Sequence, residues 1–200
     1  HRDDLIKIEK IYSATLIASV VLVLFSVLLF LFLIFTFKKF SNNFYLYIYS
    51  FAFVVFQSLL PIWFFQGMER MKYITFLSLG TSIIYLVGLF LFVKQKDDYL
   101  LVPLLHASAA LVTLGLALFL IRREFKVKLK MPKWYEVGRI LQDGRHAFIS
   151  QLAPNLYNSS AILLLGLFTN NSVVGIYAAA TKIIDAVLSF AYILSSTFLP

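Results

Sequence analysis

An uninterrupted apolar stretch constrains this chain more than any other feature. Ile11–Phe37 contains 27 residues and no Asp, Glu, Lys or Arg. A helix of about 20 apolar residues is long enough to cross the hydrocarbon core of a bilayer, which is about 30 Å thick. A stretch of this length is therefore predicted to span a membrane.

Similar stretches recur along the whole chain, and they are continuous instead of alternating with polar residues, which favours helices over barrel strands. The composition agrees, because 60% of the residues are hydrophobic and only 14% are charged. We predict an all-α, polytopic integral membrane fold with six transmembrane helices. The expected spans are Ile11–Phe37, Phe44–Phe65, Tyr73–Val93, Tyr99–Ile121, His146–Phe168 and Val173–Pro200.

The basic residues fall unevenly on alternate connections between these spans. Thirteen of the 18 Lys and Arg residues lie in residues 1–10, 66–72 and 122–145, and four lie in the other connections. Since cytoplasmic connections of membrane proteins are enriched in Lys and Arg, we expect these three segments to be cytoplasmic. The net charge of +8 then reflects membrane topology, and we expect no nucleic-acid partner.

The longest connection, residues 122–145, carries eight of these cations. Its run Lys126–Lys130 is either an ordinary topogenic segment or a contact for anionic membrane lipids. Lys133–Leu141 follows Pro132 and places Trp134, Val137, Ile140 and Leu141 on one face, which predicts a short interfacial helix.

Polar residues inside an apolar span are costly, so their positions are informative. In the last span, Lys182, Asp185, Ser189, Tyr192 and Ser196 share one helical face. Lys182 and Asp185 are either a structural ion pair or a cavity site, in which the amine meets an anionic substrate and the carboxylate balances it.

Other spans carry weaker polar stripes. Gln151, Asn155 and Asn158 share a face of the fifth span, for which helix packing and cavity lining are equally plausible. For the third and fourth spans, packing is the favoured interpretation. Their stripes are Ser78, Thr81, Ser82 and Tyr85, and His106, Ala110, Thr113 and Ala117.

Catalytic chemistry has little support in the sequence. The chain has no cysteine, and His1, His106 and His146 are too far apart for a helical metal motif. Asp97 and Asp98 are expected to interact with a helix N-terminus. We therefore predict no catalytic residue, no metal and no cofactor.

Three segments carry a resemblance to a known family. They are Trp63–Ile74, Phe148–Asn158 and Gly166–Asp185, the last containing Val174-Gly-Ile-Tyr-Ala-Ala-Ala-Thr-Lys-Ile-Ile-Asp. They resemble O-antigen repeat-unit flippases of the Wzx type, in the multidrug/oligosaccharidyl-lipid/polysaccharide exporter superfamily.

The resemblance implies about twelve helices in two lobes, of which this fragment would contain helices three to eight. Residues 1–121 would then end the first lobe, 122–145 would form the cytoplasmic connector, and 146–200 would begin the second lobe. The expected location is the bacterial inner membrane.

The resemblance also implies a substrate, an undecaprenyl-pyrophosphate-linked oligosaccharide that crosses the membrane during polysaccharide biosynthesis. Gln151, Asn155 and Asn158 would bind sugar, and Lys182, Asp185 and Arg145 would form the site for the anionic part. Membrane lipids, a polysaccharide polymerase and a chain-length regulator are the further partners expected.

Three other functions stay open at this point. A cation-coupled multidrug antiporter would use Asp185 as its ion site. A membrane glycosyltransferase or polymerase would need a large extracytoplasmic loop, which this region lacks. A structural scaffold would use the polar stripes only for packing.

Overall fold

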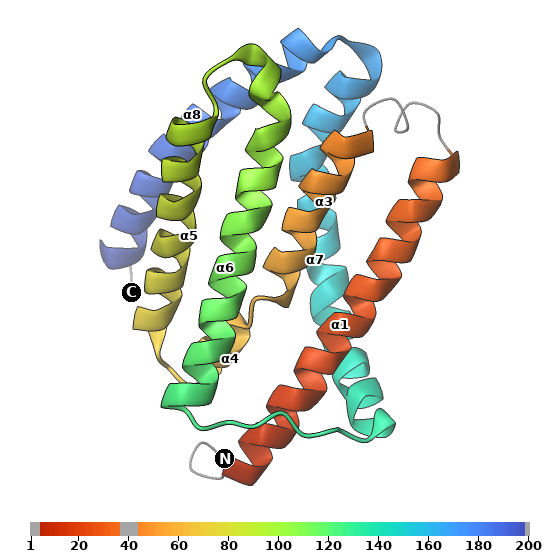
Figure 1. Cartoon of the computed structure of the whole chain (residues 1–200), viewed down its shortest axis with the longest axis vertical. Coiled ribbons are helices and arrows are strands. Elements are labelled where there is room, and N and C mark those ends of the chain that lie inside the picture. Colours follow the sequence, from red (N-terminus) through yellow and green to blue (C-terminus); the bar gives the residue numbers. More distant parts are fainter. Residues whose placement is uncertain (1–4, 37–43, 199–200) are drawn as a thin grey trace. The chain divides into compact units, whose positions relative to one another are not determined.

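The computed structural model describes residues 5–36 and 44–198, and the side chains in these ranges except Asn158, Asn171 and those after Ser189. In the described ranges the secondary structure is entirely helical (Figure 1). The helices are α1 (Leu5–Thr36), α3 (Phe44–Leu59), α4 (Ile62–Gly67), α5 (Met71–Phe92), the 3-10 helix η1 (Lys96–Leu100), α6 (Leu101–Glu124), α7 (Trp134–Phe168) and α8 (Asn171–Phe198).

The chain divides into two units, His1–Gln142 and Asp143–Pro200. This division falls inside the segment expected to connect two lobes, close to its end. The assignment of residues 1–121 and 146–200 to separate lobes stays a prediction.

Within the first unit, α6 lies between α3 and α5 and packs on both (Figure 1). The face of α6 that makes these contacts consists largely of small residues. Four alanines of α6 are buried, namely Ala107, Ala109, Ala110 and Ala117. Small residues let helix backbones approach closely, which is how helices associate in a membrane where apolar surface alone gives no advantage. The opposite faces of these helices expose large apolar side chains, such as Phe90, which is 76% exposed.

Five helical stretches in the described residues are long and apolar enough to cross a membrane. They are Leu5–Thr36, Phe44–Gly67, Met71–Phe92, Lys96–Glu124 and Ser172–Ser189. The prediction of an all-α, polytopic membrane protein is therefore confirmed. The expected fifth span, His146–Phe168, is helical throughout, and among the described residues it contains the shorter apolar stretch Ser159–Phe168.

Two expected helices have different bounds in the structure. The predicted span Phe44–Phe65 is broken after Leu59, and Pro61 precedes the short helix α4. A proline ring has no N–H to donate and restricts the residue before it, so it favours such a break.

The predicted interfacial helix, Lys133–Leu141, is not a separate helix in the structure. It forms the first part of the 35-residue helix α7, which begins at Trp134. Its first turn is capped where Glu136 Oε2 accepts the Lys133 N–H at 2.9 Å. On this first part of α7, Val137 is buried and Trp134 is 77% exposed.

Candidate functional site

An aromatic cluster closes one end of the first unit. Phe65 is fully buried, and its ring lies 5.5 Å from that of Tyr73 and 6.0 Å from that of Phe125. The centroid of the Tyr12 ring lies 5.3 Å from that of Phe64 and 5.8 Å from that of Trp63. The cluster joins α1, α4, α5 and the end of α6.

This cluster has a consequence for topology. It brings the first turns of α1, the segment between α4 and α5, and the segment after α6 to the same end of the unit. These belong to the three connections that the charge distribution groups on one side. The aromatic residues of Trp63–Ile74, which carried the family resemblance, thus hold this end together.

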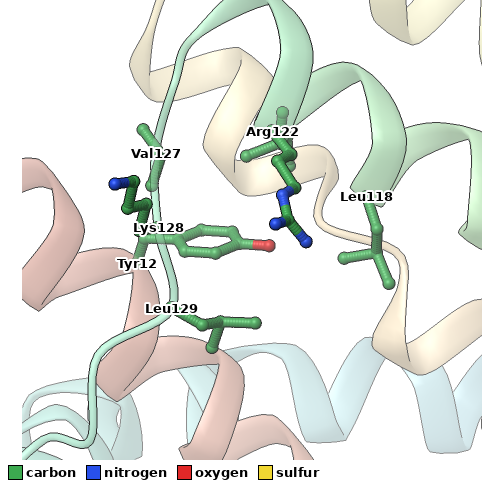
Figure 2. Close-up of a pocket in the computed structure, with 7 residues that line it drawn as sticks. Tyr12, Leu118, Arg122, Val127, Lys128 and Leu129 are labelled. Carbon is green, nitrogen blue, oxygen red and sulfur yellow. The ribbon is translucent and has the colours of Figure 1, made fainter.

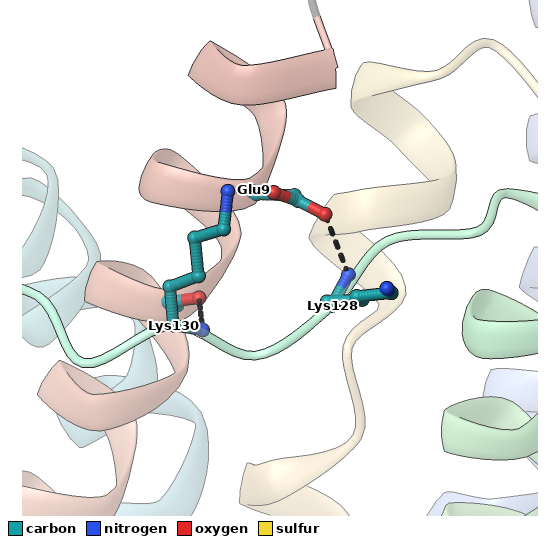
Figure 3. Close-up of polar contacts among 4 residues, drawn as sticks. Glu9, Lys128 and Lys130 are labelled. Carbon is teal, nitrogen blue, oxygen red and sulfur yellow. Dashed lines mark hydrogen bonds and ion pairs between the residues drawn. The ribbon is translucent and has the colours of Figure 1, made fainter.

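Polar contacts bind the segment after α6 to α1 at the same end (Figure 3). Glu9 accepts the backbone N–H of Lys128 at 3.1 Å and forms an ion pair with the Lys130 ammonium. The backbone N–H of Lys130 donates to Ser13 Oγ at 2.9 Å. An extended segment has no ladder partners, so these side chains supply acceptors for two of its N–H groups.

Sequence reasoning did not identify Glu9 and Ser13. The signal that could have found Glu9 is its position, a carboxylate next to an apolar span on the basic side. A carboxylate there needs a cation, and residues 122–145 hold eight.

The polar stripes of the third and fourth expected spans face each other. Thr81 and Thr113 hydroxyls lie 2.7 Å apart, and Thr113 is buried. The His106 ring stacks on Phe53 of α3, with centroids 3.8 Å apart, and on Tyr85 of α5, at 4.5 Å. These stripes pack helices together, as the favoured interpretation predicted.

In the second unit, two of the predicted sugar-binding residues line one pocket. Gln151 and Asn155 border a space of about 300 Å³ along α7, together with apolar side chains such as Phe148 and Leu152. The side chain of Asn158 lies outside those described. Arg145, one turn or more earlier, is exposed and donates from Nε to His146 Nε2 at 3.3 Å.

Lys182 and Asp185 are both exposed on α8, and within the described side chains no ion pair joins them. Ser189, one turn further, is exposed on the same face and donates to the Asp185 carbonyl at 2.7 Å. Tyr192 and Ser196 lie outside the described side chains. The amine and the carboxylate are therefore both accessible on the surface of α8.

The residues that the structure describes contain no group of three His, Asp or Glu side chains that could hold a metal ion. Asp98 instead accepts the backbone N–H groups of Lys94 and Gln95, both at 2.9 Å, at the start of η1. This confirms the expected role of Asp98 at a helix N-terminus.

Five stretches long and apolar enough to span a membrane, with small buried residues where α6 packs on its neighbours, define a polytopic integral membrane protein. The polysaccharide biosynthesis protein family matches the chain over residues 1–200, and the chain belongs to this family.

Two curated relatives carry the name "Putative O-antigen transporter". The protein from Escherichia coli (strain K12) is 31% identical over 181 residues, which is 90% of this chain and 43% of the relative. The protein from Shigella dysenteriae is 25% identical over 180 residues, which is 88% of this chain and 44% of the relative. The chain thus spans less than half the length of either relative. No solved structure matches it significantly.

Proposed function

We propose that the intact protein moves an undecaprenyl-pyrophosphate-linked oligosaccharide repeat unit across the bacterial inner membrane, from the cytoplasmic to the periplasmic leaflet. The observation that carries this proposal is the family match over residues 1–200 of a chain with five candidate membrane-spanning helices. The names of the two relatives support the same assignment. We infer transport without covalent change of the substrate.

The chemistry of such a substrate explains why a protein is needed. A sugar head group and a pyrophosphate are strongly hydrated, and neither crosses about 30 Å of hydrocarbon unaided. A transporter must therefore offer hydrogen-bonding side chains and a cation inside the membrane.

Residues on α7 and α8 suit these two tasks. Gln151, Asn155 and Asn158 offer amide groups that can bind sugar hydroxyls. Lys182 lies about 16 Å along α8 from Asn171, near the depth at which alternating-access transporters bind substrate. We propose that Lys182 binds the pyrophosphate, that Asp185 balances it, and that Arg145 lies at the cytoplasmic entrance.

The other partners follow from the product. A repeat unit delivered to the periplasmic leaflet must be joined to others, so we propose a polysaccharide polymerase and a chain-length regulator as the proteins that act next. Residues 1–10, 66–72 and 122–145 are proposed to face the cytoplasm.

Complementation of a deletion strain tests the proposal. We expect Lys182→Ala to abolish surface O-antigen at unchanged protein level, while Lys182→Arg keeps part of it and Asp185→Asn has a mild effect. Lys96→Ala, a cation outside the apolar segments, is the matched control. Full O-antigen with Lys182→Ala would remove Lys182 from the mechanism.

The antiporter alternative predicts a different pattern. There, Asp185→Asn would abolish proton- or sodium-driven drug efflux, and deletion of the gene would leave O-antigen on the surface. That pair of results would overturn the flippase assignment.

A further inference from the structure

A pocket of about 400 Å³ lies where α6 meets the extended segment that follows it (Figure 2). Its walls are of two kinds. Aliphatic side chains, among them Leu118 and Leu129, form one part, and Tyr12, Arg122 and Lys128 supply polar ends. In Figure 2 the Tyr12 hydroxyl and the Arg122 guanidinium both point into the space beside Leu118, and the Lys128 amine is turned away from Arg122.

Arg122 is the cation whose charged group points into this pocket, because the Lys128 amine is turned away. The residues that line the pocket include no Asp or Glu, and Arg122 forms no ion pair with any side chain that the structure describes. The carboxylate bound to the neighbouring segment, Glu9, is engaged by Lys130 and by the Lys128 backbone. Lys130, although part of the basic run, is therefore the cation least available to another anion.

The position of Arg122 in the sequence gives this pocket the expected depth of lipid head groups. Arg122 directly follows the uncharged stretch Tyr99–Ile121 and begins the basic connection, which is where a spanning helix leaves the hydrocarbon. Leu118 is one turn earlier, about 6 Å deeper along the helix. The pocket thus presents a cation at the expected membrane surface and Leu118 toward the membrane interior.

We propose that this pocket binds an anionic membrane lipid, with its phosphate on Arg122 and on the Tyr12 hydroxyl and its hydrocarbon against Leu118 and Leu129. A guanidinium binds a phosphate through two parallel N–H donors, and a phenol O–H can donate a third bond. Basic pockets on the cytoplasmic side of membrane helices bind lipid head groups through such contacts. The proposal needs only the membrane location of the chain and is independent of the transported substrate.

Binding of phosphatidylglycerol to the delipidated, intact protein in detergent tests the proposal. We expect phosphatidylglycerol to raise the unfolding temperature, and phosphatidylcholine to do so much less. Arg122→Gln should weaken phosphatidylglycerol binding about tenfold or more, because a charge-assisted hydrogen bond is lost. Tyr12→Phe should weaken it a few-fold while keeping the aromatic ring in its cluster.

Arg123→Gln is the matched control. Arg123 is the neighbouring cation, but its guanidinium lies 5.9 Å from the Phe119 ring and it does not line the pocket. We expect this variant to bind phosphatidylglycerol as the unmodified protein does. Equal losses from Arg122→Gln and Arg123→Gln would overturn the proposal, because they would show only a general effect of charge.

Two further ligands, inorganic phosphate and a polyprenyl pyrophosphate, test whether the pocket prefers a membrane lipid over other phosphate-containing molecules. If inorganic phosphate stabilises the protein as much as phosphatidylglycerol does, the pocket is an ion site and the lipid proposal is wrong. If a polyprenyl pyrophosphate binds through Arg122 and phosphatidylglycerol does not, the pocket belongs to the substrate path and the proposal is also wrong. If Arg122→Gln fails to fold, Arg122→Lys is used in its place, and its phosphatidylglycerol binding should weaken by less than tenfold. Unchanged binding in both Arg122→Lys and Tyr12→Phe would overturn the proposal.

Discussion

Glu9 and Lys130 are joined by an ion pair, 2.5 Å from Oε2 to Nζ, although they lie at opposite ends of the first unit's sequence. The Glu9 side chain is 11% exposed and that of Lys130 is 52% exposed. The same carboxylate accepts the Lys128 N–H, so one residue of α1 holds two residues of the segment after α6. The first turns of α1 and this segment are therefore held together.

Loss of the Glu9 carboxylate is expected to release the segment. In Glu9→Gln the ion pair to Lys130 is absent, so limited proteolysis of the purified protein should cut within residues 126–131 several-fold faster. Lys126→Gln removes an exposed cation of the same run and should leave the rate unchanged. Restored protection in Glu9→Lys combined with Lys130→Glu would show that the pair itself matters; equal cleavage of Glu9→Gln and the unmodified protein would contradict its role.

The hydroxyl pair between α5 and α6 is expected to stabilise their contact. Thr113→Val leaves the Thr81 hydroxyl without its partner on α6, which should cost about 1 kcal/mol of unfolding free energy. Thr75→Val is the control, because Thr75 is exposed and its hydroxyl bonds only to the Met71 carbonyl of its own helix. Unfolding free energies in detergent, compared in a cycle with Thr81→Val, measure the coupling; additive losses would show that none exists.

Phe65 is expected to be the most sensitive aromatic position. Its side chain is fully buried among Phe64, Tyr73 and Phe125, so Phe65→Ala leaves a cavity and should cost about 3–5 kcal/mol. Phe90→Ala removes an identical side chain that is 76% exposed and should change stability little. Thermal unfolding and the yield of folded protein compare the two variants, and a similar loss in both would show that burial is not the cause.

Two glycines of α5 are expected to respond differently to alanine. A Cβ added at Gly88 would lie 3.2 Å from Leu105 Cδ2 on α6, whereas one added at Gly80 would meet no atom within 4 Å. Alanine favours a helix over glycine by about 1 kcal/mol, so Gly80→Ala should stabilise the protein. Gly88→Ala should gain less because Leu105 must shift, and Gly88→Leu should destabilise it. The unfolding temperatures of the three variants should therefore decrease from Gly80→Ala to Gly88→Ala to Gly88→Leu. A higher unfolding temperature in Gly88→Leu than in the unmodified protein would contradict this expectation.

The pocket on α7 is expected to matter for export and not for folding. Gln151→Leu and Asn155→Leu remove amide groups from the exposed border of that pocket, so protein level should stay unchanged while surface O-antigen decreases several-fold. Leu152→Met changes an apolar residue of the same pocket and serves as the control. Normal O-antigen in a Gln151→Leu and Asn155→Leu double variant would exclude this face from the substrate path.

Helical structure was readable from single stretches of sequence, because a chain in lipid must satisfy its backbone hydrogen bonds locally. The expected bounds Tyr73–Val93 differ from α5 (Met71–Phe92) by two residues at most. The charge asymmetry likewise grouped the connections that the aromatic cluster brings to one end of the first unit. The candidate residues on α7 and α8 were chosen by helical spacing, and their role in transport stays a prediction.

Contacts between distant segments needed the folded chain, because they depend on which helix faces meet. No local pattern links Tyr12 with Phe64, or Glu9 with Lys130, since their side chains meet only after the helices have packed. The break before Pro61 and the continuation of α7 through Gly138 and Gly144 were also decided at this level. The length of an apolar stretch determines that a segment is a membrane helix. The packing of helices determines where such a helix breaks, and it determines that Glu9 pairs with Lys130 and not with Arg122.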